Sequence, residues 1–361
     1  MKTNASIFRC LATVIAMVFG AATQTSFAQT TSATTPVGFV TMSVSGTGGT
    51  KPTAYTFTSL GLVNPIAFQS TTTASTGGPT IVDTAATWAN NAYNSATAGA
   101  PPSHFVEILS GPAAGAMYDI VTTDGTGKSL TVSPALAAGV TAGVSYAIRP
   151  HWTIASVFGP TVNQAGGLAG GSAADADQIQ LFRNGNYVGY LYQTSGRGVL
   201  VNAWVSTTDL NADASTTVIY PDDGILVIRK QSASASIALN GSVKTGQTAI
   251  PVQTGYSLLG NVYAAGMTLG NSNLYTGNSA TGVANGSAAD ADQIIFWNGS
   301  NFVQYFYQTS GRGVLLDAWV STNDLNAPAG NTPIPAGAAL FIKRNGAPFT
   351  WVAPQFPTTF N

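Results

Sequence analysis

The feature that most constrains this chain is a long segment that occurs twice. Residues 171–178 (GSAADADQ) recur letter for letter as residues 286–293, and residues 192–212 recur as residues 307–327 with three substitutions. Both blocks are displaced by 115 residues, so one structural unit has been duplicated whole. Self-similarity at a fixed offset indicates a supersecondary unit that occurs more than once in the fold. A repeated unit without catalytic residue types favours binding or assembly over chemistry.

Apolar residues alternate with polar ones or run in short blocks, which is the spacing of β-strands. Within each copy the expected strands follow one plan: residues 177–182 match 292–297, residues 187–192 match 302–307, and residues 224–229 match 338–343 at an offset of 114. Residues 152–158 and 256–263 are expected to open the two copies. The sequence therefore predicts an all-β fold built from serial β-sandwich or barrel-like units, including a tandem duplicated unit.

The chain divides into five segments. Residues 1–28 have the basic, apolar and small-residue pattern of a signal peptide, which ends at Ser26-Phe27-Ala28. Residues 29–36 are expected to be a flexible leader, and residues 37–150 an N-terminal β domain. Residues 151–253 and 254–361 are expected to be the two repeat units.

Charge is scarce, since only 7% of the residues are Asp, Glu, Lys or Arg. The chain lacks the clustered Lys and Arg that nucleic-acid binding requires, so nucleic acid is not an expected partner. No second apolar stretch follows residues 1–28, and we expect no membrane span in the mature chain. An exported location follows from the signal peptide: periplasm, cell surface or extracellular space.

The duplicated Asp-x-Asp pattern is a candidate calcium site. Alternating carboxylates in a loop supply the hard oxygen ligands that calcium prefers, but calcium takes about six to eight of them. The alternative is that these aspartates cap a turn and begin a strand, with Arg197 or Arg312 as an ion-pair partner. The residues concerned are Asp175, Asp177, Asp290 and Asp292. No other cofactor is expected.

The loop Gln193-Thr-Ser-Gly-Arg-Gly and its copy at residues 308–313 each place an arginine between two glycines. One interpretation is that Arg197 and Arg312 are presented to an anionic or sugar ligand. The other is a structural turn in which each guanidinium bonds backbone carbonyls or the Asp-x-Asp loop. The whole surrounding block is retained between the copies, which favours the structural turn.

Aromatic residues form the third candidate site. Trp204 and Trp319 are equivalent in the two copies, and Trp297 and Tyr305 lie on neighbouring expected strands. Exposed rings could stack on sugars. The alternative is that they fill the core of each unit, where tryptophan is usually mostly buried.

Several motifs resemble those of known proteins. They are the Ala-Asp-Gln-Ile strand, the aromatic strand after it, Pro-x-x-(Gly/Ala)-x-Leu-(Val/Phe)-Ile-(Arg/Lys), and His104-Phe-Val-Glu-Ile-Leu-Ser-Gly-Pro. Together they resemble an uncharacterised family of exported bacterial proteins found as many paralogues in Verrucomicrobia-type genomes. That family has no assigned activity, so the resemblance carries over neither an activity nor catalytic residues.

Three functions are open at this point. The leading hypothesis is a non-enzymatic protein of the cell surface or extracellular matrix that acts by adhesion or self-association, with itself or other surface proteins as partners. The second is a tandem carbohydrate-binding module that binds polysaccharide through exposed aromatics. The third is a secreted hydrolase, although His104 and His151 lack an evident catalytic set and Glu107 is the only glutamate.

Overall fold

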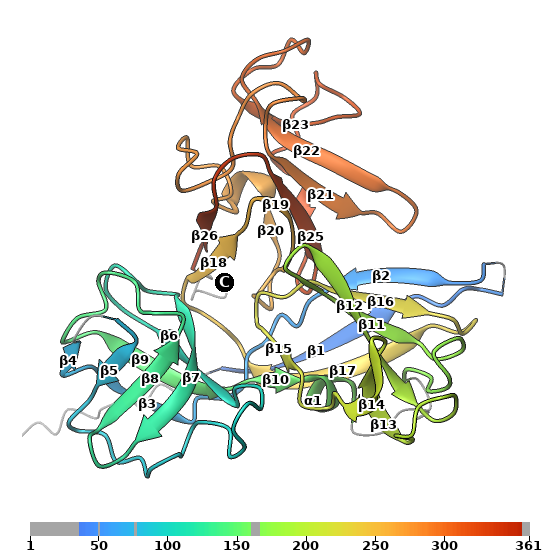
Figure 1. Ribbon diagram of the computed structural model, residues 1–361. Helices are drawn as coiled ribbons and strands as arrows, with labels where there is room; N and C mark the ends of the chain where they lie inside the picture. Colours follow the sequence, from blue (N-terminus) through green and yellow to red (C-terminus); the bar gives the residue numbers. More distant parts are fainter. Residues whose placement is uncertain (1–35, 50, 76–77, 160–166, 356–361) are drawn as a thin grey trace, which may run out of the picture. The chain divides into compact units, whose positions relative to one another are not determined.

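β-Strands make up nearly all of the regular structure in the computed structural model, which describes residues 36–49, 51–75, 78–159 and 167–355 (Figure 1). The prediction of an all-β fold is confirmed. The expected signal peptide at residues 1–28 and nearly all of the expected leader at residues 29–36 lie outside the described residues. Within the described part of the chain, no helix has the length and apolar character needed to cross a membrane.

The second repeat contains a five-stranded antiparallel sheet and two strand pairs. The sheet order is β19 (Gly255–Gly260), β25 (Ala339–Arg344), β21 (Gln293–Trp297), β22 (Phe302–Gln308) and β23 (Ala318–Ser321). One pair joins β18 (Thr248–Val252) to β26 (Phe349–Ala353). The other joins β20 (Met267–Thr268) to β24 (Pro333–Ile334), and the short helix η2 (Leu269–Asn271) follows β20.

The first repeat has the same plan with one strand added. Its sheet order is β14 (Asp209–Asp213), β13 (Ala203–Ser206), β12 (Asn186–Gln193), β11 (Gln178–Arg183), β16 (Ile225–Arg229) and β2 (Ala54–Thr58). The pair β1 (Val37–Val44) with β17 (Ala235–Ser242) corresponds to β18 with β26. The pair β10 (Trp152–Thr153) with β15 (Val218–Ile219) corresponds to β20 with β24, and helix α1 (Ile154–Phe158) takes the place of η2.

A seven-stranded sheet interrupts the first repeat. Its order is β3 (Phe68–Thr71), β9 (Ser145–Pro150), β6 (His104–Ile108), β7 (Met117–Asp124), β8 (Ser129–Ser133), β5 (Thr80–Val82) and β4 (Ala74–Ser75). These strands lie in sequence between β2 and β10, where the second repeat has only residues 261–266 between β19 and β20. Residues 37–150, expected to form one N-terminal domain, therefore belong to two parts of the fold. Strands β1 and β2 pair with strands of the first repeat, and the strands from β3 to β9 form an inserted domain.

The strand registers correct two details of the sequence comparison. The counterpart of β19 is β2, which pairs with β16 as β19 pairs with β25, so residues 152–158 do not open the first repeat. Gln178 faces Ile228 while Gln293 faces Lys343, which makes Ile228 and Lys343 equivalent. The offset therefore stays at 115 in this strand, and Arg229 corresponds to Arg344.

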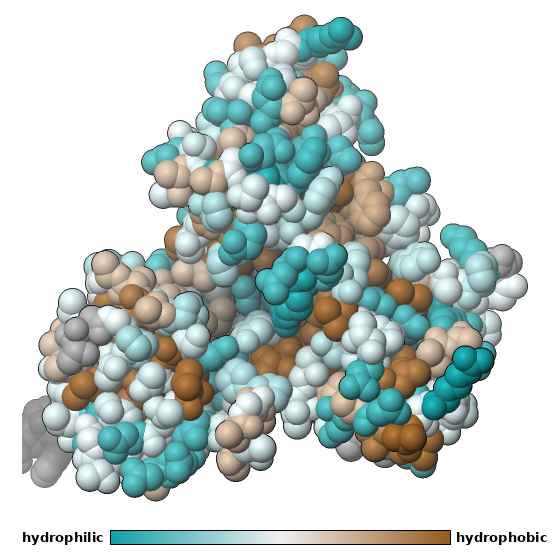
Figure 2. All heavy atoms as spheres, in the orientation of Figure 1, coloured by the Kyte–Doolittle hydropathy of each residue, from teal (hydrophilic) through white to brown (hydrophobic). Residues whose placement is uncertain are grey.

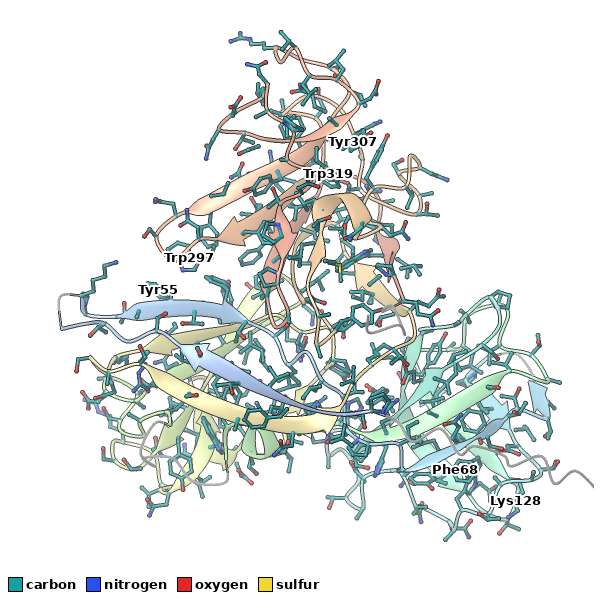
Figure 3. All side chains as sticks on the ribbon, turned by 180° about the vertical axis from the view of Figure 1, so that it is seen from behind. Tyr55, Phe68, Lys128, Trp297, Tyr307 and Trp319 are labelled. Carbon is teal, nitrogen blue, oxygen red and sulfur yellow. The ribbon has the colours of Figure 1, made fainter. Side chains whose placement is uncertain are left out.

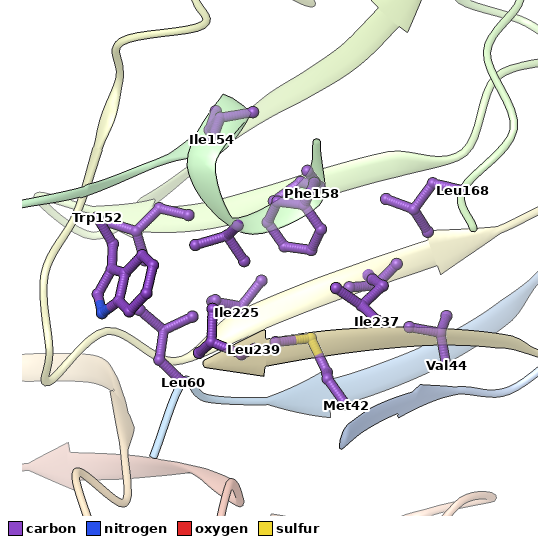
Figure 4. Packing of buried hydrophobic residues seen from close by; sticks show 14 of the residues in the cluster. Met42, Val44, Leu60, Trp152, Ile154, Phe158, Leu168, Ile225, Ile237 and Leu239 are labelled. Carbon is purple, nitrogen blue, oxygen red and sulfur yellow. The ribbon is translucent and has the colours of Figure 1, made fainter. Parts of the chain in front are cut away.

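Three large apolar clusters fill the fold. The cluster of the first repeat brings together β1, α1, β16 and β17, with Met42, Trp152 and Leu239 all buried (Figure 4). A second cluster fills the second repeat around Trp351, and a third fills the inserted domain around Trp88 and Tyr146. Alternate burial along β17 places every second side chain in the core, as expected for a strand with one solvated face.

Candidate functional site

The two sequence blocks that recur most faithfully meet in space. Gly171 forms a parallel bridge with Gln193, and Gly286 forms the same bridge with Gln308. Identity between the copies is uneven, because residues 178–191 match residues 293–306 at only five of 14 positions, whereas residues 192–212 match at all but three positions. The retained blocks therefore form one local structure, built once on each repeat.

A buried glutamine organises this structure in each copy. The Gln193 side-chain amide donates to the carbonyl oxygens of Leu200 and Leu210. In the second repeat, Gln308 donates in the same way to Leu315 and Leu325. A further bond repeats as well, since the amide of Val199 lies 2.9 Å from Asn211 Oδ1 and that of Val314 lies 2.9 Å from Asn326 Oδ1. The loop backbone is thus held by the same contacts twice.

This backbone presents apolar side chains to solvent in both copies. Val199 is 84% exposed and its counterpart Val314 is 85% exposed. Val201 and its counterpart Leu316 are about equally exposed, at 51% and 50%. We call Arg197, Val199 and Val201 the first tip, and Arg312, Val314 and Leu316 the second tip. The apolar character of four exposed positions has no explanation within the fold.

The two candidate arginines belong to these tips. Arg197 and Arg312 are both exposed, and neither forms a hydrogen bond or ion pair with any described residue. The interpretation in which each arginine bonds the Asp-x-Asp loop is therefore wrong. The loop is stabilised by the glutamine and the backbone instead, which leaves both guanidinium groups available to a partner.

The Asp-x-Asp carboxylates are already occupied by protein groups. Asp177 is buried, forms an ion pair of 2.7 Å with Arg229, and accepts hydrogen bonds from the amides of Ala169 and Lys230. Asp292 repeats this arrangement with Arg344, Ala284 and Asn345. The outer carboxylates accept from serine, with Ser172 on Asp175 and Ser287 on Asp290, each at 2.6 Å.

The calcium hypothesis fails for this reason. The buried carboxylate oxygens already accept from arginine and backbone amides, so a cation would have to displace an arginine from a buried ion pair. Among the described residues, no group of three or more His, Cys, Asp or Glu side chains is arranged to hold a metal ion. Asp177 and Asp292, which immediately precede β11 and β21, serve as structural ion-pair partners.

Metal removal should therefore leave stability unchanged. We expect the melting temperature of the purified protein to be the same with excess EDTA as with millimolar calcium, because no carboxylate depends on a cation. Differential scanning calorimetry measures this directly. A calcium-dependent rise of several degrees that is lost in the double variant Asp175→Asn with Asp290→Asn would contradict the assignment.

Trp204 and Trp319 are core residues. Trp204 is 2% exposed and its indole N–H donates to the Gly159 carbonyl at 2.8 Å, while Trp319 is 5% exposed. Each packs edge-on against a tyrosine of the neighbouring strand, with 5.6 Å between the ring centroids of Tyr192 and Trp204. The equivalent distance between Tyr307 and Trp319, which Figure 3 labels, is 5.8 Å. The expectation that these two rings form an exposed sugar platform is wrong, because each is needed to fill its sheet's core.

Trp297 and Tyr305 are only partly buried. Tyr305 packs on the core of the second repeat beside Phe296. Trp297 lies among aromatic rings from both repeats, including Tyr55 of β2 at 6.5 Å between ring centroids (Figure 3). Phe57 of β2 joins the same group and also contacts Phe341 of β25. These rings join the sheets of the two repeats, so Trp297 has a structural role in addition to its partial exposure.

A cavity of about 830 Å³, lined by apolar and titratable side chains, was not anticipated from the sequence. Its wall includes Asp119 of β7 in the inserted domain and His151, which follows β9. The first repeat contributes Arg183 and residues 220–223, and the second repeat contributes β19. The hydroxyl of Tyr220 donates to Asp119 at 2.8 Å, and Nε2 of His151 lies 2.9 Å from the other oxygen of Asp119. The cavity therefore brings titratable side chains of distant segments together.

Arg183 and Asp223 fix the floor of this cavity. The guanidinium of Arg183 binds both oxygens of Asp223, and its carbon lies 5.0 Å from the centroid of the Tyr220 ring. Although burial opposes it, the charge of Asp223 raises the pKa of Arg183. Burial, followed by the nearby charge of Asp119, raises the pKa of Tyr220 above its ordinary value. Arg183 therefore stays protonated, and Tyr220 keeps its phenolic proton.

A sequence signal for the cavity exists in the divergence of the repeats. The segment Tyr220-Pro-Asp-Asp corresponds to Pro335-Ala-Gly-Ala, with no identity at the four positions, and Arg183 corresponds to Asn298. The tips are common to both repeats, whereas the cavity residues of this segment occur only in the first repeat.

Few charged side chains are available to any surface of this molecule, since they make up 7% of the sequence. Figure 2 shows apolar and polar residues interspersed on one face of the molecule. This agrees with the small share of charged residues in the sequence.

No protein-family model matches the chain, and the curated proteins compared with it include no match.

Proposed function

We propose that this chain is an exported, non-enzymatic protein of the cell surface or extracellular matrix that acts by adhesion or self-association through its two tips. The observation that supports this most is the pair of equally exposed valines, Val199 and Val314, on loops held by the same internal bonds. A side chain that packs against nothing in its own fold is free to pack against a partner. Because the contact occurs twice on one chain, binding is bivalent.

The chemistry of the tips suits another protein surface. Exposed aliphatic side chains next to an arginine suit an interface core, which is more apolar than the remaining surface and is enriched in Arg. The low charge of the whole chain also lowers the electrostatic repulsion between copies. Two sites on each chain raise the apparent affinity of each site through effective concentration.

Substituting the arginine and the most exposed valine of both tips should weaken the association strongly. The quadruple variant Arg197→Ser, Val199→Ser, Arg312→Ser, Val314→Ser is expected to raise the concentration needed for assembly, or for retention on cell-wall material, by about tenfold or more. Multi-angle light scattering over a concentration series and a sedimentation assay with cell-wall fragments measure the two cases. The substituted side chains are exposed, so stability should change by no more than about 0.5 kcal/mol per site.

A single-tip variant distinguishes bivalent from monovalent action. Arg197→Ser with Val199→Ser impairs one tip and leaves the other intact, and assembly should then stop at small closed species while adhesion loses its avidity. If the quadruple variant assembles and adheres like the unmodified protein, the tips are not the contact surface and the proposal is wrong.

The carbohydrate-binding alternative loses its original basis, because two of the three proposed tryptophans are buried in the core. Trp297 retains partial exposure but packs between the two repeats. The repeated structure therefore does not favour sugar binding through a platform of coplanar tryptophan rings.

A further inference from the structure

The cavity between the inserted domain and the two repeats contains side chains whose hydrogen-bonding capacity is unused. The Asp222 carboxylate receives no hydrogen bond from another described residue, and the same holds for the side-chain amides of Asn184 and Gln253 at the cavity wall. The ring nitrogens of His151 are buried and lack a well-aligned hydrogen-bond partner, although Asp119 lies close to one of them. Asn184 and Gln253 are exposed at the rim and Asp222 is half-buried, so their free hydrogen-bonding groups face the cavity opening, where a ligand can reach them. The buried ring nitrogens of His151 are the exception in a fold whose buried polar groups are mostly paired.

The charges of the cavity select among ligand classes. Arg183 is neutralised by the two oxygens of Asp223, so the cavity offers no free cation to an anionic ligand. What remains is one carboxylate that accepts, two amides that both donate and accept, and the half-exposed ring of Tyr256, which is 50% exposed. Sugar hydroxyls donate and accept in the same way, and the apolar face of a sugar ring stacks on an aromatic ring.

We propose that this cavity binds a short neutral oligosaccharide, with Asp222 accepting hydrogen bonds from sugar hydroxyls and Tyr256 stacking on a sugar ring. Its volume of about 830 Å³ lies inside the usual range of small-molecule sites. Arg183, Asp223 and Tyr220 are held in place by contacts within the protein, which lowers the entropic cost of ordering the site on binding. The site is separate from the tips and does not depend on them.

The protonation of Asp222 gives the site a pH signature. Burial, followed by the charge of Asp223, raises the pKa of Asp222 to about 7. The carboxylate accepts hydroxyl hydrogen bonds best when ionised, so affinity should fall as the pH decreases through 7. The other titratable and charged groups that face it are Asp119 on β7, His151 before β10, Arg183 on β11, Tyr220 and Asp223 after β15, and Tyr256 on β19.

The test uses a panel of neutral trisaccharides of glucose, mannose, xylose and N-acetylglucosamine with the purified full chain. Saturation-transfer NMR screens the panel, and isothermal titration calorimetry measures the trisaccharide with the strongest signal. We expect Asp222→Ala to weaken binding by about ten- to a hundredfold, as for a hydrogen bond to a charged group. Tyr256→Ala should weaken it by about two- to tenfold, and Asp222→Asn should remove the pH dependence.

The controls separate this site from the rest of the molecule. Asp317→Asn removes an exposed carboxylate in the second repeat and should leave sugar affinity unchanged, and Asp222→Ala should leave assembly through the tips unchanged. The proposal is overturned if no trisaccharide binds, or if binding is the same in Asp222→Ala. It is equally overturned if choline or spermidine binds in an Asp222-dependent way while the sugars do not.

Discussion

Replacing Glu107 with glutamine is expected to lower the free energy of unfolding by about 3–5 kcal/mol, the usual cost of removing one partner from a buried charge group. Glu107 is 3% exposed and binds both Arg149 and Lys244, which are equally buried. Its Oε2 lies 2.8 Å from Nε of Arg149, and its Oε1 binds the ammonium of Lys244. Glutamine leaves two buried cations without a counter-charge. Urea unfolding followed by tryptophan fluorescence measures the loss.

The matched control is Asp317→Asn, the same carboxylate-to-amide change at an exposed position. Its counterpart in the first repeat is already Asn202, and both residues have a positive φ, 54° and 57°, which asparagine tolerates. This variant should stay within about 0.5 kcal/mol of the unmodified protein. Equal stability of the Glu107 and Asp317 variants would show that the buried charge group does not stabilise the fold.

The same charge group makes stability depend on pH in a defined direction. Burial raises the pKa of Glu107, but the positive charges of Lys244 and Arg149 outweigh it and hold the pKa below the ordinary value of 4.5. A lowered pKa means that the unfolded chain binds the proton more readily. The stabilisation is therefore complete above about pH 4.5 and is lost as the pH falls through the lower folded-state pKa. The Glu107→Gln variant should lack this part of the acid transition.

The sequence was most informative where the chain repeats itself. Strand periodicity and the duplicated blocks predict the all-β fold and the equivalence of Trp204 with Trp319, because local patterns determine strands and identical segments fold alike. The inserted domain could not be found this way. Its strands alternate as the repeats do, and only the pairing of β2 with β16 shows that residues 54–58 belong to the first repeat.

Long-range partners were the least predictable part of the candidate sites. The buried aspartates pair with Arg229 and Arg344, each 52 positions further along the chain, and not with the arginines of the nearby loop. Scarcity of charge made the nearby arginine an attractive partner, but strand register brings the distant arginine beside the aspartate. The cavity depends in the same way on Asp119 and Tyr220, which are 101 positions apart.

Replacing Trp204 with alanine is expected to have an effect as large as that of Glu107→Gln, by a different mechanism. Deleting a buried tryptophan removes apolar burial and leaves a cavity, which costs about 3–5 kcal/mol. The indole also donates its N–H to Gly159 and packs on Tyr192 and Phe158, so the loss extends to α1. Urea unfolding measures the change, and Trp319→Ala provides an independent replicate in the second repeat.

The aromatic control for this prediction is Phe39→Ala on β1. Phe39 is 64% exposed, so its removal should cost at most about 0.5 kcal/mol. Iodide quenching of the unmodified protein gives a second readout, because Trp204 and Trp319 are shielded from solvent while Trp297 is partly exposed. Quenching should therefore disappear largely in Trp297→Phe. A Trp204→Ala variant as stable as Phe39→Ala would place this indole outside the core and restore the exposed sugar platform as a candidate site.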